Sequence, residues 1–137
     1  MTAVPHLQFD LNFKPAAEAK KRFSAAVVTH FARVMDTGTD HIAVSLRCGE
    51  LEDQTFGRAI DPAKGIAFIN ADLRKNRTPQ QKRDFALAVI GELEQVLQAP
   101  PASVYVLFTE HDGPDVQTHD GVLPSRSTGE DPLTQLR

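Results

Sequence analysis

Pro5 is the residue of this chain whose chemistry depends most on its position. Inside a peptide, the nitrogen of a proline is an amide that carries no proton and has no useful basicity. At a chain terminus the same nitrogen is a secondary amine. An ordinary α-amino group titrates at about 7.7–8.0, and burial in an apolar site lowers that pKa further. A terminal Pro5 is therefore able to act as an acid or a base near neutral pH.

Four residues, Met1 to Val4, precede Pro5 as the sequence is written. With them in place the Pro5 nitrogen is an amide, and amine chemistry would need another group, such as that of Thr2 after loss of Met1. The alternative is that translation starts at Val4, because bacteria can initiate at a valine codon with a methionine that is then removed before a proline. The native chain would then begin at Pro5. The intact mass of the protein from its own host distinguishes these starts.

The strand that carries Pro5 is predicted from a strict alternation over residues 4–13, which is typical of a strand with one buried face. Its apolar side is formed by Leu7, Phe9, Leu11 and Phe13. A helix is expected next, with Pro15 at its first position and Gly38 in the left-handed conformation near its end. The buried side of that helix is predicted to contain Phe23, Val27, Phe31 and Val34.

The same order of elements follows in the second half of the chain. A second strand is predicted over residues 41–48, and a polar loop with room for a short hairpin over residues 49–65. Thr78, Pro79 and Gln81 form a capping box that starts a second helix. The flanking strands are predicted over residues 66–73 and 103–108.

The order strand, helix, strand thus occurs twice, with a shift of about sixty residues between the halves. It predicts an α/β (α+β) fold in which two β-α-β repeats form a four-stranded mixed sheet with two helices on one face. The other face of the sheet stays partly apolar, through either Ile66 and Phe68 or Ala67 and Ile69. An uncovered apolar face favours self-association.

Length and composition indicate a single globular domain. The chain has 137 residues, of which 41% are hydrophobic and 24% charged, with a net charge of −3. We assign residues 5–124 to the domain, residues 1–4 to an extension before the proline, and residues 125–137 to a polar and mobile tail. The charge disfavours nucleic acid, no apolar run is long enough for a membrane, and no signal peptide is visible, so we expect a cytoplasmic protein.

Neither a metal nor another cofactor is expected. Cys48 is the single cysteine, which excludes an internal disulfide and a multi-cysteine metal site, and its position on the apolar side of a strand favours a role in the core. His6, His30 and His41 do not have the spacing of metal ligands.

Four segments, taken together in order and spacing, resemble the tautomerase superfamily, whose members include oxalocrotonate tautomerase, macrophage migration inhibitory factor, malonate semialdehyde decarboxylase and cis-chloroacrylic acid dehalogenase. They are Pro-His-Leu-Gln-Phe-Asp-Leu from Pro5, His-Ile-Ala-Val from His41, Leu-Arg-Lys-Asn-Arg-Thr from Leu73, and Ser-Val-Tyr-Val-Leu-Phe-Thr-Glu from Ser103. The resemblance implies a homotrimer with the sheets inside, active sites at the subunit boundaries, and a terminal proline as acid or base.

The resemblance also implies a site for a carboxylate. Arg74 and Arg77 have the spacing of two arginines that hold the substrate carboxylate in the dehalogenase-like members, and a guanidinium offers a planar fork of donors to such a group. The decarboxylase-like members have closer arginines, which would align Lys75 with Arg77. From composition alone, two solvated arginines in a helix-capping turn would be favoured; the family context favours the functional interpretation.

Two further positions have counterparts in these families. Asp40 lies near an aspartate that orients a water or substrate in the decarboxylase-like members, although the residues alone favour a plain turn. Tyr105 is similar to a pocket tyrosine of the inhibitory-factor branch, and a half-buried strand tyrosine is an equal alternative. Leu107 and Thr118 depart from the dehalogenase pattern, and His30 is out of register with its helix histidine, so that enzyme's own reaction is not expected.

The function implied is therefore proton transfer on, or hydration or decarboxylation of, a small 2-oxo acid or unsaturated carboxylate. It requires Pro5 to be the mature amino terminus. The alternative is a non-catalytic trimeric relative in which residues 1–4 block the proline.

Overall fold

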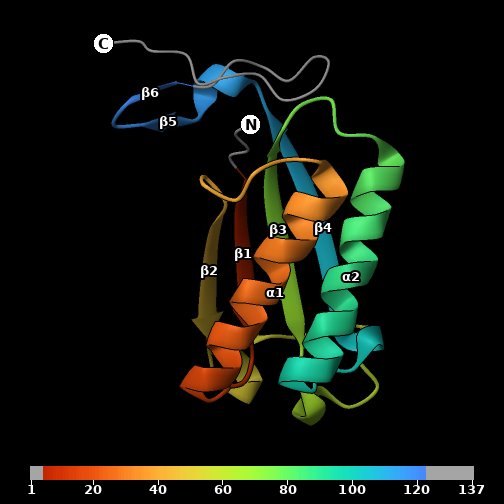
Figure 1. Cartoon of the computed structure of the whole chain (residues 1–137). Coiled ribbons are helices and arrows are strands. Elements are labelled where there is room, and N and C mark those ends of the chain that lie inside the picture. Colours follow the sequence, from red (N-terminus) through yellow and green to blue (C-terminus); the bar gives the residue numbers. More distant parts are fainter. Residues whose placement is uncertain (1–4, 123–137) are drawn as a thin grey trace.

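The computed structural model describes residues 5–122 and has two layers (Figure 1). Four strands form one sheet in the order β2-β1-β3-β4, and both long helices cover the same face of it. This confirms the predicted architecture. The long elements are β1 (His6–Leu11), α1 (Ala17–Met35), β2 (Ala43–Cys48), β3 (Ala67–Arg74), α2 (Pro79–Leu97) and β4 (Val104–His111).

The sheet is mixed because two parallel pairs meet along an antiparallel seam. β1 runs parallel to β2, and β3 runs parallel to β4. The two central strands are antiparallel, with His6 opposite Asp72 and Phe9 opposite Ile69. Each element of the first half recurs about sixty residues later, as the repeat predicts. As a result, the starts of β1 and β2 lie at the same end of the sheet, along the strand direction, as the ends of β3 and β4.

The hydrophobic core lies between the sheet and the helices. Phe9 of β1 contacts Phe23 of α1 edge to face, with ring centroids 5.0 Å apart, and Phe31 of α1 contacts Phe85 of α2 at 5.2 Å. β3 presents its buried side to the helices through Ala67, Ile69, Ala71 and Leu73. Phe68 therefore lies on the opposite, uncovered face, which resolves the alternative that the sequence leaves open.

The ends of α1 differ from the prediction, whereas the start of α2 confirms it. Pro15 precedes the N-cap of α1 instead of occupying its first position, and Asp36, with φ of 52°, takes the left-handed conformation expected of Gly38. The last turn closes locally, because the N–H groups of Asp36 and Thr37 both bond the carbonyl oxygen of Ala32. The Arg77 guanidinium adds a distant contact by donating to the carbonyl oxygen of Met35 at 2.9 Å. At α2, Thr78 and Gln81 form the predicted capping box.

The short elements also differ from the prediction. The loop after β2 contains two 3-10 turns, η1 (Leu51–Asp53) and η2 (Pro62–Lys64), and no hairpin within its described residues. β4 extends past residue 108 to His111. A turn, η4 (Gly113–Asp115), and a small hairpin of β5 (Gln117–Thr118) and β6 (Gly121–Val122) follow it. The predicted extension and tail, residues 1–4 and 125–137, lie outside the described residues.

Asn12 holds this loop against the end of β1. Its side chain is fully buried; Nδ2 donates to the carbonyl oxygens of Leu51 and Pro62, both at 3.2 Å, and Oδ1 accepts the N–H of Ile66 at 2.7 Å. Buried backbone groups of this kind need partners. One side chain thus anchors the loop at three points.

We expect Asn12→Leu to lower the free energy of unfolding by about 2–3 kcal/mol, because a leucine of similar volume leaves the buried N–H of Ile66 without its acceptor and removes two further hydrogen bonds to the loop. Urea unfolding followed by circular dichroism measures the change. The matched control is Gln80→Ala, which removes an exposed amide bonded to Asp84 and should change stability by less than about 0.5 kcal/mol. A similar small change for Asn12→Leu would contradict the anchoring role.

Candidate active site

Pro5 lies at the end of the sheet where β1 begins. It is buried, and its carbonyl oxygen accepts the N–H of Ala43 at 3.1 Å, which ties the start of β1 to the start of β2. A cavity of about 350 Å³ opens beside it. Its walls come from all four strands and the segment after β4, and include Pro5, His6, Ala43, Asp72 and His111.

The cavity wall contains a hydrogen-bonded group of polar side chains. Asp72 of β3 contacts two residues of the neighbouring strand β4. Its Oδ1 accepts a hydrogen bond from the Thr109 hydroxyl and lies 3.3 Å from His111 Nε2. On the other side, His6 Nε2 is 2.9 Å from Ser45 Oγ. Strand register explains the arrangement, because His6 and Thr109 are the direct neighbours of Asp72 on β1 and β4. The imidazoles of His6 and His111 and the carboxyl groups of Asp72 and Asp115 line the cavity next to Pro5.

The two arginines lie at this same end of the sheet, and both are buried. Arg74 is the last residue of β3 and is 1% exposed; Arg77 is 5% exposed and contacts the end of α1 through Met35. This burial rules out two solvated arginines. Neither is among the described side chains that line the cavity. The third cation of the turn, Lys75, is exposed and pairs with Asp112 at 3.2 Å.

The other two predicted site residues are not among the described side chains that line the cavity beside Pro5. Asp40 is exposed in the turn before β2. Tyr105 pairs with Phe68 at the start of β4, whereas His111 pairs with Arg74 at its end. At about 3.3 Å per residue this separation along the strand is roughly 20 Å. Within one chain the structure does not bring Tyr105 to Pro5.

Solved structures with the same layout identify the fold. One similar structure is the macrophage migration inhibitory factor of Toxoplasma gondii, with a TM-score of 0.76 and 14% identity over 86% of this chain and 99% of that one. The chain has the tautomerase fold. A fused 4-OT, described as an asymmetric trimer, has a TM-score of 0.73 and 19% identity over 85% of this chain and 94% of that one.

Malonate semialdehyde decarboxylase is also similar, with a TM-score of 0.68 and 16% identity over 81% of this chain and 88% of that one. Neither a protein-family model nor a curated protein matches the sequence. Identities this low show the tautomerase fold and leave the reaction to be tested. Among residues 5–122, no helix is long and apolar enough to cross a membrane.

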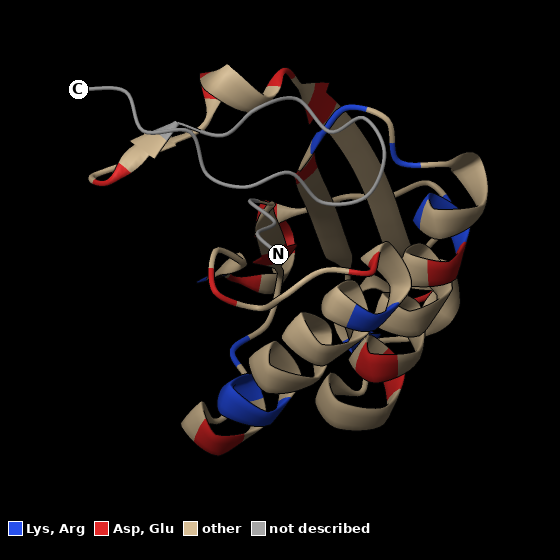
Figure 2. Cartoon of the chain, turned by 45° about the horizontal axis from the view of Figure 1, so that its top comes forward, with Lys and Arg blue, Asp and Glu red and all other residues tan. Residues whose placement is uncertain are grey.

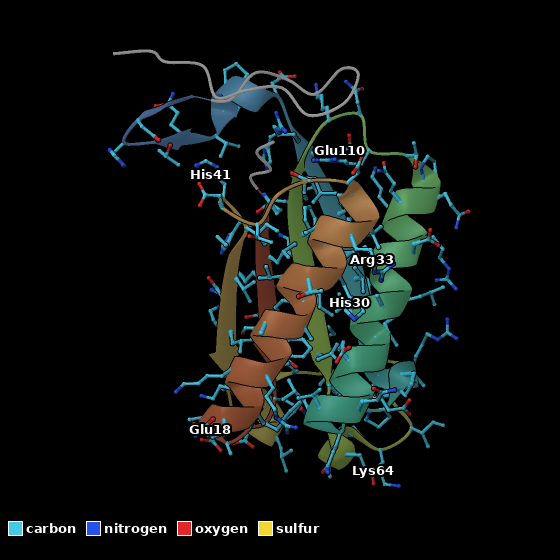
Figure 3. The ribbon with its side chains drawn as sticks, viewed as in Figure 1. Glu18, His30, Arg33, His41, Lys64 and Glu110 are labelled. Atoms are coloured by element: carbon cyan, nitrogen blue, oxygen red, sulfur yellow. The ribbon has the colours of Figure 1, made fainter. Side chains whose placement is uncertain are left out.

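Two carboxyl groups near this edge of the tautomerase fold have lowered pKa values. The hydrogen bond from Lys82 lowers the pKa of Glu110, and the hydrogen bond from Thr118 lowers that of Asp120, with a further contribution from His41. Figure 3 labels Glu110 and His41 at this end of the molecule, and Figure 2 shows acidic and basic positions there as well as along the helices. Both carboxyl groups stay ionised at neutral pH, so neither is a suitable proton donor there.

Neither Asp72 nor His111 is among the site residues predicted from the sequence. The predicted fourth strand ends at residue 108, which leaves His111 in the polar segment that follows. One signal was available: Asn70 and Asp72 are polar residues in a strand whose first half is apolar. In the part of the chain that the structure describes, no three His, Cys, Asp or Glu side chains form a group that could hold a metal.

Proposed function

We propose that this chain is a tautomerase-superfamily protein that acts on a small 2-oxo acid or unsaturated carboxylate. The chemistry is keto–enol tautomerisation, hydration or decarboxylation, with Pro5 as acid or base when it is the mature amino terminus. One observation carries the proposal: Pro5 is buried in the wall of a 350 Å³ cavity that also contains Asp72 and His111. A buried amine there would have the environment that lowers its pKa toward neutrality.

Arg74 is one of the two candidates for binding the substrate carboxylate. It lies at the same edge of the sheet as Pro5, since the antiparallel register that pairs His6 with Asp72 brings the end of β3 to the start of β1. Arg77 already donates one N–H to Met35, which fixes its orientation.

We further propose that the protein is a homotrimer. The uncovered face of the sheet contains Phe68, Tyr105 and Leu107, of which Tyr105 is 46% and Leu107 45% exposed. Phe56 packs edge to face on Phe68 and Tyr105 and extends the apolar surface. Self-association would bury these rings and would bring Tyr105 of one copy toward Pro5 of another. The trimers described for the fused 4-OT structures support this arrangement.

Leu107→Asp is expected to convert the protein to a monomer at micromolar concentration, because it places an unpaired carboxylate in the centre of the proposed interface. Light scattering after size-exclusion chromatography measures the mass. Leu51→Asp is the matched control, since Leu51 is 49% exposed and lies in η1, outside the four-stranded sheet. A monomeric parent protein, or dissociation by both variants alike, would contradict the proposed interface.

Ketonisation of phenylenolpyruvate tests the catalytic proposal. The protein is assayed in two forms, one beginning at Met1 and one beginning at Pro5. Activity that depends on a free Pro5 amine supports proline chemistry. Equal inactivity of both forms supports the alternative, a non-catalytic oligomer that keeps the fold without a working amine.

A further inference from the structure

The cavity beside Pro5 contains a histidine whose orientation is fixed by a carboxylate. His111 Nε2 is 3.3 Å from Asp72 Oδ1, and the same carboxylate accepts the hydroxyl proton of Thr109. The His111 side chain is 44% exposed and that of Asp72 34% exposed, and both line the cavity. The imidazole is therefore held in place and is also open to a small molecule.

The hydrogen bond decides which nitrogen of His111 is basic. An ionised carboxylate only accepts hydrogen bonds, so Nε2 must carry the proton that is shared with Asp72. In the neutral ring this leaves the lone pair on Nδ1. A carboxylate that fixes the tautomer of a histidine in this way is the usual partner of a general base.

Three of the other ionisable groups near the cavity are less suited to move a proton, and a fourth, Asp115, also lines the cavity. Glu110 is paired with Lys82, and Asp120 is held as the ion by Thr118. His6 uses Nε2 for its bond to Ser45, and no described carboxylate orients it. The Pro5 nitrogen, when residues 1–4 precede it, is an amide without a proton.

We infer that His111, oriented by Asp72, is a proton-transfer group of this cavity whether or not Pro5 is the amino terminus; the inference rests on the proposed function. With a 2-oxo acid, Nδ1 removes a proton from C3, the C–H electron pair forms the C2=C3 bond, and the carbonyl π pair moves to oxygen. The imidazolium then returns that proton to the oxygen, which gives the enol. The reverse sequence gives ketonisation, and no proton or electron is gained or lost overall.

The form that begins at Met1 isolates the histidine, because its Pro5 is an amide. In that form His111→Ala should lower kcat for phenylenolpyruvate about 100-fold, at the lower end of what a general acid or base contributes. KM should change little, since the lost interaction belongs to the transition state. Free imidazole should restore much of kcat by occupying the space of the missing ring. Asp72→Asn should also lower kcat, and imidazole should not restore it because the His111 ring still fills the site.

His30→Ala is the matched control. His30 Nε2 lies 2.9 Å from Glu92 Oε1, so it is also a histidine paired with a carboxylate. It joins α1 to α2 within the helix layer and not in the sheet (Figure 3). It should leave kcat unchanged and show no response to imidazole.

The outcomes separate this inference from the proposed function. Suppose that the form beginning at Pro5 is active. The inference alone is then overturned if the Met1 form is inactive, or if His111→Ala leaves kcat of the Met1 form unchanged. A loss that imidazole does not restore assigns His111 a structural role and also overturns it. If neither form of the parent protein is active, the proposed function fails, and the inference fails with it.

Discussion

A chain that begins at Pro5 will ketonise phenylenolpyruvate about 10²–10⁴ times faster than a chain that retains residues 1–4. The difference is one proton-binding nitrogen, since Pro5 is a secondary amine in the first form and an amide in the second. Its buried position beside a cavity of about 350 Å³ places that amine next to the substrate. Initial rates of both forms at equal protomer concentration measure the effect.

A form beginning at Val4 is the sharpest control. It has a free amine one residue away and the same Pro5 side chain, so it should be as slow as the form with Met1. Equal rates in all three forms would refute proline chemistry while leaving enzymatic activity in place. The intact mass of the protein from its own host shows which of these forms the cell contains.

Phe9→Ala will lower the free energy of unfolding by about 3–5 kcal/mol. Phe9 is fully buried on the central strand β1 and contacts Phe23 edge to face at 5.0 Å, so the shortened side chain removes apolar burial and leaves a cavity on the sheet–helix boundary. Urea unfolding at a fixed protomer concentration measures the loss, since assembly makes stability depend on concentration.

Phe56→Ala serves as the comparison for this substitution. Phe56 also makes two edge-to-face contacts, with Phe68 at 5.9 Å and Tyr105 at 6.1 Å, but it lies on the uncovered face and is only half-buried. Its loss should cost clearly less in the free energy of unfolding. If both variants lose the same stability, the core is not concentrated between the sheet and the helices.

Patterns that repeat along the chain predicted most of the fold. Alternation placed Leu7, Phe9 and Leu11 on the buried side of β1 because successive strand residues face opposite sides. The capping box at Thr78 predicted the start of α2 because its bonds join residues three apart. Both signals are local, and local signals can be read from the sequence.

Features that depend on distant contacts could not be predicted in this way. The contact between Arg77 and the end of α1 joins residues more than forty positions apart in the chain, so no local pattern predicts it. The pairing of Asp72 with Thr109 and His111 depends on the register between β3 and β4. No periodicity within one strand reveals which side chains of the next strand lie beside it.

The internal repeat limits how many amine centres one protomer can hold. Ile66 directly precedes β3 as Pro5 directly precedes β1. Because these central strands are antiparallel, the two positions lie at opposite ends of the strands. At Ile66 the backbone nitrogen is an internal amide whose N–H is bound by Asn12. A polypeptide has a single amino terminus. When two such halves are joined end to end, the second half therefore has no terminal amine to act as acid or base. A carbonyl electrophile that captures the terminal amine would thus saturate at one equivalent per protomer.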